Sequence, residues 1–226
     1  MGFFHQAFVI TVKDLRAELR TKEAVNSSFA FALVILLLFS FAFDSFEETT
    51  QQMAGGLLWI VFAFAGTLIL NRSFARELPN DCLDALIAAP ISGAALFLGK
   101  AIANFVLVMA VELISLPVFG IFSNVHWTRQ FPELMLVLVL GSWGMTIIGT
   151  IFSALTVNIR LREVMLPMLT YPILIPPLMG AMQLTSGLVA GTPIAPDTVV
   201  WLKVLIGFDV VYTAVSLFLV ETVLVG

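Results

Sequence analysis

The sequence has little charge, two histidines and a single cysteine. Only 12% of its 226 residues are Asp, Glu, Lys or Arg, and Cys82 has no second thiol for an internal disulfide. No group of cysteines and histidines has the spacing of a zinc site. The chain is 60% hydrophobic with a mean hydropathy of +1.04. Soluble domains are roughly 45–50% apolar, so this composition excludes a water-soluble fold.

Motifs for nucleotide binding and hydrolysis are also absent. No G-x-x-x-x-G-K-[ST] loop occurs, so the chain cannot hold nucleotide phosphates in the manner of a P-loop. Neither G-x-S-x-G nor H-E-x-x-H occurs, and these motifs carry a serine nucleophile or a catalytic zinc. We therefore predict that the chain is not an enzyme and that any ATP is hydrolysed by another subunit.

Six long apolar runs dominate the sequence instead. A helix needs roughly 17–25 such residues to cross the hydrocarbon core of a bilayer. The runs cover residues 27–43, 53–70, 94–122, 134–157, 164–188 and 201–225. We predict an all-α integral membrane protein of six transmembrane helices. It forms a single domain, 1–226, because the connections leave no room for a separate soluble domain.

Residues 3–22 precede the first run and have the pattern of an amphipathic helix. Apolar residues recur every three or four positions, opposite a basic face. The apolar positions are Phe4, Phe8, Val12, Leu15 and Leu19, and the basic positions are Lys13, Arg16 and Arg20. We predict a helix that lies in the inner interface of the membrane. The alternative is a cytosolic helix packed on a partner.

The basic residues are distributed unequally between the two sides of the predicted bundle. One side has Lys13, Arg16, Arg20, Lys22, Arg72, Arg76, Lys100, Arg160 and Arg162, and the other has Arg129 and Lys203. Cytoplasmic loops carry the excess of Lys and Arg. The richer side is therefore predicted to be cytoplasmic, and an even number of spans places both termini there.

The cytoplasmic connection 71–90 has a pattern of its own. Asn80 or Asp81 can cap a short helix, which Pro90 would end. The apolar face of this helix would consist of Leu83, Leu86 and Ile87. That face either packs on the spans of the chain itself or is offered to a cytosolic partner, and the residues leave both alternatives open.

Two carboxylates fall inside predicted spans, Glu112 in 94–122 and Asp209 in 201–225. An ionisable group costs a few kcal/mol at such a depth and is a candidate for a functional role. Each is expected either to be protonated or to hydrogen-bond to a neighbouring span. An interhelical hydrogen bond that fixes packing and a role in substrate movement or partner docking are the two interpretations.

The fifth predicted span, 164–188, is rich in proline. Each proline removes a backbone donor and clashes with the preceding turn, so the helix is expected to be kinked or broken. The four residues are Pro167, Pro172, Pro176 and Pro177. Broken helices survive in lipid only where protein or a water-filled cavity surrounds them. We therefore expect this span in the interior of an assembly or at a subunit contact.

Three stretches of the chain carry specific sequence motifs. The most specific stretch is 149–166, with an Ala-Leu-Thr-Val core, followed by Leu-Pro-x-Leu-x-x-Pro. It contains the turn Arg160-x-Arg162-Glu163. Residues 14–20 and 74–100 are the other two stretches. These stretches resemble the haem exporter protein B family, the permease subunit of cytochrome c maturation, and the resemblance covers most of the chain.

The resemblance implies a six-span ABC-type (ABC-2-like) transmembrane subunit in a bacterial inner membrane. Its expected partners are a cytosolic ABC ATPase, a haem-handling membrane subunit, a small accessory membrane subunit and a periplasmic haem chaperone; nucleic acid is not among them. The inner loop would then be the coupling helix that docks on the ATPase, through Asp81, Leu83, Asp84, Leu86 and Ile87. ATP would be used, and haem handled, by partner subunits.

One departure from the resemblance concerns haem. The tryptophan-rich motif of the haem-handling partner is absent, because Trp59, Trp127, Trp143 and Trp201 are scattered. We therefore assign no cofactor or metal to this chain. The alternatives are an ABC-2-type permease for another cargo, such as a lipid, drug or glycan, and a non-conducting scaffold that transmits motion of the ATPase. Few polar residues line the spans, which mildly favours the scaffold.

Overall fold

The computed structural model describes residues 2–43, 48–78, 86, 89–123 and 127–225. Within these ranges the regular secondary structure is helical, without a strand. The long helices are α1 (Phe3–Thr21), α2 (Glu23–Ala42), α3 (Glu48–Leu70), α5 (Gly93–Phe122), α6 (Phe131–Thr156), α7 (Arg162–Val189) and α8 (Val199–Val225). A short 3-10 helix, η1 (Ala75–Glu77), follows α3. The prediction of an all-α protein is confirmed.

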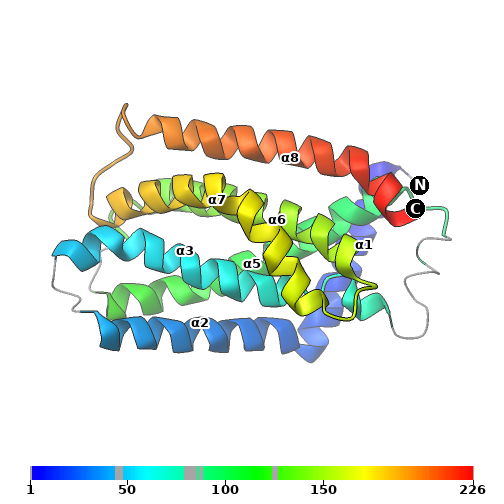
Figure 1. The fold of residues 1–226 in the computed structure, drawn as a ribbon, viewed down its shortest axis with the longest axis horizontal. Helices are drawn as coiled ribbons and strands as arrows, with labels where there is room; N and C mark the ends of the chain where they lie inside the picture. Colours follow the sequence, from blue (N-terminus) through cyan, green and yellow to red (C-terminus); the bar gives the residue numbers. More distant parts are fainter. Residues whose placement is uncertain (1, 44–47, 79–85, 87–88, 124–126, 226) are drawn as a thin grey trace.

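Six of these helices, from α2 to α8, are long and apolar enough to cross a membrane. They run side by side along the long axis of the molecule, whereas α1 lies across one end of the bundle (Figure 1). The C-terminal end of α8 lies at that same end (Figure 1). The number and order of the predicted spans are therefore confirmed, with α1 placed as a separate N-terminal helix.

The helix α1 turns a small-residue face toward α5 and its aromatic residues away from the bundle. Ala7 and Ile10 are buried, whereas Phe4 and Phe8 are 80% and 65% exposed. The left-handed backbone of Lys22 (φ 55°) ends α1 and lets α2 begin at the next residue. The helix predicted over 3–22 is confirmed. Its exposed aromatic face has the chemistry that the membrane interface requires.

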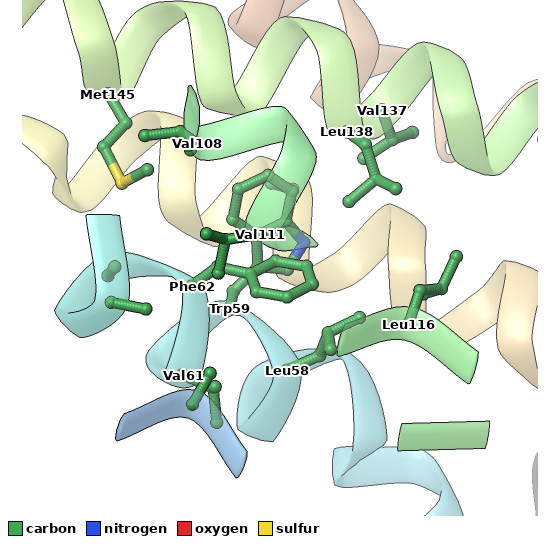
Figure 2. Packing of buried hydrophobic residues seen from close by; sticks show 14 of the residues in the cluster. Leu58, Trp59, Val61, Phe62, Val108, Val111, Leu116, Val137, Leu138 and Met145 are labelled. Atoms are coloured by element: carbon green, nitrogen blue, oxygen red, sulfur yellow. The ribbon is translucent and has the colours of Figure 1, made fainter. Parts of the chain in front are cut away.

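The core of the bundle is built around α3, which packs between α2, α5, α6 and α7. Figure 2 shows Trp59 and Phe62 of α3 among aliphatic side chains of α5 and α6. The indole Nε1 of Trp59 donates to Thr185 Oγ1 at 2.9 Å. A Cβ at Gly141 of α6 would overlap the Trp59 ring, so glycine is what permits this close approach.

The proline-rich helix α7 is continuous from Arg162 to Val189, with all four prolines inside it. Its direction changes between the yellow and the orange part of the ribbon (Figure 1). Of the two predicted outcomes, the structure therefore shows a bent helix and not a broken one. Pro172 and Pro176 are exposed and Pro177 is buried. One face of α7 packs on α3, α6 and α8, while whether its exposed face meets another subunit stays a prediction.

Candidate functional site

A buried lysine near the start of α5 organises the charged groups at the α1 end of the bundle. Lys100 is 1% exposed. Its Nζ lies 3.1 Å from Asp14 Oδ2 and 3.0 Å from Glu77 Oε1, and it donates to the carbonyl of Ser73 at 3.0 Å. The Phe74 ring lies 5.0 Å from the same Nζ. A buried ammonium is tolerated because it is paired and hydrogen-bonded in this way.

A second ion pair lies beside the first. Glu18 of α1 is 1% exposed and pairs with Arg76 of η1. The other carboxylate oxygen of Glu18 accepts a hydrogen bond from the backbone N–H of Val25, at 2.9 Å. We call the group Lys13, Asp14, Glu18, Arg76, Glu77 and Lys100 the ionic junction. It joins α1, η1, the beginning of α2 and the beginning of α5.

Lys13 completes the ionic junction at its exposed edge. Its Nζ lies 2.5 Å from Glu77 Oε1 and 3.1 Å from Asp14 Oδ1. Burial lowers the pKa of Lys13, but the charge of Asp14 and the hydrogen bond to Glu77 outweigh burial and raise the pKa above its usual 10.5. Lys13 therefore stays charged at neutral pH, and the junction contains three cations and three anions.

A neutral branch connects the junction to α6. Asn104, one turn after Lys100 on α5, donates from Nδ2 to Ser73 Oγ at 2.8 Å and to Thr150 Oγ1 at 2.9 Å. Asn104 is buried. Four helical elements, α1, η1, α5 and α6, thus meet through polar side chains at this end of the bundle.

The ionic junction borders the segment 79–88 on one side, and a separate hydrogen bond from α1 borders it on the other. Of the predicted docking residues, Asp81, Leu83, Asp84 and Ile87 lie outside the described residues, as do both proposed caps; Leu86 alone is described. Before the segment, Glu77 is held by Lys13 and Lys100. After it, the carbonyl of Pro90 accepts from Gln6 Nε2 at 3.3 Å. Both borders are therefore tied to α1, and docking itself stays a prediction.

The first intramembrane carboxylate, Glu112 of α5, has a partner on α6. It is 1% exposed, and Ser142 Oγ lies 2.7 Å and 2.6 Å from its two carboxylate oxygens. Ser142 is itself fully buried. The interhelical hydrogen bond that the sequence predicts as one interpretation is therefore present at Glu112.

The second carboxylate, Asp209 of α8, has no such partner. It is 7% exposed, and neither oxygen has a hydrogen-bond partner among the described residues. Its Oδ1 lies against Gly144 of α6, where a Cβ would come within 2.7 Å. The predicted interhelical hydrogen bond is therefore not found for Asp209.

The two carboxylates are not brought together. Their neighbours on α6, Ser142 and Gly144, are two positions apart, which is about 200° around a helix. Glu112 and Asp209 therefore lie on opposite sides of α6 at similar height along it. A shared acid pair or a two-carboxylate metal site is not formed, and among the described residues no group of three or more metal-ligating side chains occurs.

The ionic junction was missing from the sequence-based site, although one signal for it existed. Lys100 is an isolated cation within the apolar run 94–122, and such a residue calls for a partner. Ala7, Thr11, Asp14 and Glu18 follow a spacing of four, three and four and face inward together. This stripe is the true packing face of α1, and it carries the two acids that reach Lys100 and Arg76.

Six apolar membrane-length helices, with buried charges confined to one end and to two intramembrane carboxylates, define a multi-pass helical membrane protein. Residues 5–225 match the family model described as "CcmB protein". The chain belongs to this family, which confirms the resemblance.

Curated relatives are similar over most of their length. Heme exporter protein B of Rhodobacter capsulatus is 28% identical over 187 residues, covering 81% of this chain and 85% of the relative. The protein of the same name from Paracoccus denitrificans is 28% identical over 185 residues, covering 81% and 84%. That of Escherichia coli K12 is 24% identical over 168 residues, covering 74% and 76%.

Proposed function

We propose that this chain is the membrane permease subunit of an ATP-driven complex of cytochrome c maturation, in a bacterial inner membrane with both termini in the cytoplasm. The observation that carries the proposal is the family match over residues 5–225. The relatives' name, Heme exporter protein B, supplies the link to haem. The orientation rests on the excess of Lys and Arg at the α1 end.

ATP hydrolysis belongs to a separate cytosolic subunit in this proposal, because the sequence lacks a P-loop. That ATPase docks on the loop 71–90, through Asp81, Leu83, Asp84, Leu86 and Ile87. Two contacts support this assignment. The ionic junction ties Glu77, before the segment 79–88, to α1 and α5, and the Gln6 side chain of α1 donates to the carbonyl of Pro90 after it. Movement of the docked loop is then passed to α1 and α5 together.

The output of the complex is haem delivery to a periplasmic chaperone, or release of the chaperone once it is loaded. A haem-handling membrane subunit and a small accessory subunit complete the assembly. One observation favours a non-conducting, force-transmitting role for this chain. The space between α3, α5 and α6 is filled by Trp59, Phe62 and aliphatic side chains (Figure 2), so no open passage runs through the middle of that packing.

The docking step is tested by co-purification from native membranes. A tagged chain is expected to retain the ATPase, and Leu86→Asp to lose it while inserting normally, because a charge on the apolar docking face is costly to desolvate. Leu161→Asp, in the turn before α7 and outside the apolar spans, where Leu161 is 69% exposed, serves as the matched control and is expected to retain the ATPase. Retention of the ATPase by Leu86→Asp would overturn the docking assignment.

A further inference from the structure

A groove with a cavity of about 680 Å³ lies between α2, α3 and α7, away from the ionic junction and from both carboxylates. Its size is within the roughly 300–1,000 Å³ of small-molecule sites. All of its lining residues belong to the described ranges. The groove begins at the α1 end of the bundle, where Ser27 of α2, Arg72 just after α3 and Arg162 at the start of α7 line it.

The groove is polar at one end and aromatic at the other. Arg72, Arg162 and Asn71 line the end at the membrane surface. From Arg162 to Tyr171 along α7 the groove runs about 14 Å into the bundle, at 1.5 Å per residue. The groove is thus polar at the membrane surface and apolar deeper in the membrane. An amphiphile with one charged end and one apolar end has the same arrangement and fits it.

Three aromatic rings form the deep wall. Phe64 of α3 lies 6.5 Å from Phe31 of α2 and 5.5 Å from Tyr171 of α7, between ring centroids. Tyr171 is fixed by a 3.0 Å hydrogen bond with Thr67, which also closes α3 on α7 below the groove. An apolar wall built by three helices suits an acyl chain, because it removes apolar surface from water without requiring hydrogen bonds.

The polar end has unused binding capacity. Arg162 makes no ion pair with any residue of the described ranges, and the buried Oδ1 of Asn71 has no hydrogen-bond partner there. Of the charged lining residues, Arg72 is paired with Glu23 at 3.0 Å, so Arg162 is the cation whose charge is uncompensated by an ion pair among the described residues. A guanidinium recognises phosphate through paired N–H donors, and the single charge of Arg162 complements the single negative charge of a phosphodiester.

We infer that this groove is a binding site for a membrane phospholipid. For phosphatidylglycerol, the phosphodiester lies between Arg72 and Arg162, a hydroxyl of the headgroup glycerol donates to Asn71 Oδ1, and one acyl chain lies along Phe31, Phe64 and Tyr171. The lining side chains Phe31 and Phe64 are 36% and 48% exposed, so the groove is open at the outside of the bundle and is reached from the lipid. The inference is independent of the proposed function.

The test uses the full-length protein in detergent with added dioleoyl phosphatidylglycerol, monitored by native mass spectrometry and thermal unfolding. Dioleoylglycerol, which lacks the phosphate, is the matched ligand control. The wild type is expected to bind the phospholipid at least about tenfold more tightly than dioleoylglycerol, because charge-assisted contacts with arginine are lost without phosphate. Equal binding of the two would overturn the inference.

Two variants locate the site. Arg162→Gln is expected to weaken phosphatidylglycerol binding about tenfold, whereas Arg160→Gln, two positions away and outside the groove lining, leaves it unchanged. If Arg162→Gln does not fold, Arg162→Lys and Phe31→Ala replace it, with Phe41→Ala as the control for the aromatic wall. Unchanged binding in the groove variants would refute the site.

Hemin is included as an anionic amphiphile without phosphate. Phosphatidylglycerol is expected to displace it from the groove. Hemin that binds through Arg162 and resists displacement would overturn the phospholipid assignment and identify a different occupant.

Discussion

The two charged regions of this protein differ in how completely their charges are compensated. In the ionic junction, the buried groups Lys100 and Glu18 each have an ion-pair partner and a contact to the backbone. Within the spans, Glu112 has one serine partner and Asp209 has none among the described residues. A fully paired charge holds a structure together, whereas an unpaired carboxylate in a membrane is tolerated only at a cost to stability.

The comparison assigns different roles to the two regions. The ionic junction links α1, η1 and the start of α5 by ion pairs beside the segment 79–88. Asp209 lies on α8 beside Gly144, where nothing described offsets its desolvation. We therefore expect substitutions in the junction to lower stability and substitution of Asp209 to lower function first.

The largest loss of stability is expected from Lys100→Met. It removes the one fully buried cation that Asp14 and Glu77 share and leaves only the partly exposed Lys13 to pair with both acids. Removing one partner of a buried ion pair costs up to about 3–5 kcal/mol. Thermal unfolding of the purified protein measures the loss. Lys203→Met, at an exposed lysine on α8, is the control and is expected to unfold like the wild type.

Neutralising one acid together with the lysine separates charge from packing. Lys100→Met combined with Glu77→Gln leaves Lys13 and Arg76 facing Asp14 and Glu18, and is expected to recover part of the lost stability because the charges are balanced again. If this double variant is less stable than Lys100→Met alone, the junction is not stabilised by balanced charge.

Ser142→Ala converts Glu112 into a second carboxylate without a partner. The expected cost is about 1–3 kcal/mol, the penalty of leaving a buried polar group unsatisfied. Ser153→Ala on the same helix is the control, because Ser153 is buried but makes no interhelical hydrogen bond in the described structure. Equal unfolding temperatures for the two variants would show that the Ser142 hydroxyl does not stabilise Glu112.

A small effect is expected from Glu23→Gln. Its salt bridge with Arg72 is 3.0 Å long, but the two side chains are 70% and 42% exposed. Exposed pairs contribute about 0–1 kcal/mol. Thermal unfolding at low and at high salt measures the contribution of the pair, which salt screens. If Glu23→Gln destabilises the protein as much as Lys100→Met does, exposed and buried pairs do not differ in their contribution to stability.

The smallest effect on stability is expected from Asp209→Asn, because no hydrogen bond or ion pair is lost. Its functional effect is expected to be much larger, since the substitution removes an ionisable group from the membrane interior. Mature c-type cytochromes, measured by haem staining, are expected to fall while the amount of membrane-inserted protein stays constant. Normal cytochrome levels would remove Asp209 from the functional residues.

The helices could be predicted from the sequence, while their polar contacts could not. The apolar run beginning at residue 27 understates α2, which starts at Glu23, because hydropathy does not register a polar first turn. The contact between Lys100 and Asp14 spans 86 positions and depends on how α1 folds back over α5. Glu112 packs against the side of α6 that carries Ser142, and Asp209 packs against the side that carries Gly144. The sequence around each carboxylate does not predict which side of α6 it will contact.

For the predicted docking loop, the sequence predicts the element itself and the structure describes only its borders. The pattern of Leu83, Leu86 and Ile87 predicts a short amphipathic helix, and most of that segment lies outside the described residues. What the structure adds is the anchoring of its borders, through Glu77 on one side and Pro90 on the other. This anchoring gives the predicted docking helix a physical route to α1 and α5.

Deleting the gene for this chain in its native bacterium tests the proposed role in cytochrome c maturation. Haem staining of membrane and periplasmic fractions measures covalently attached haem. We predict that c-type cytochromes disappear and return when the wild-type gene is supplied, and that the Lys100→Met variant restores them poorly. Undiminished c-type cytochromes in the deletion strain would contradict it.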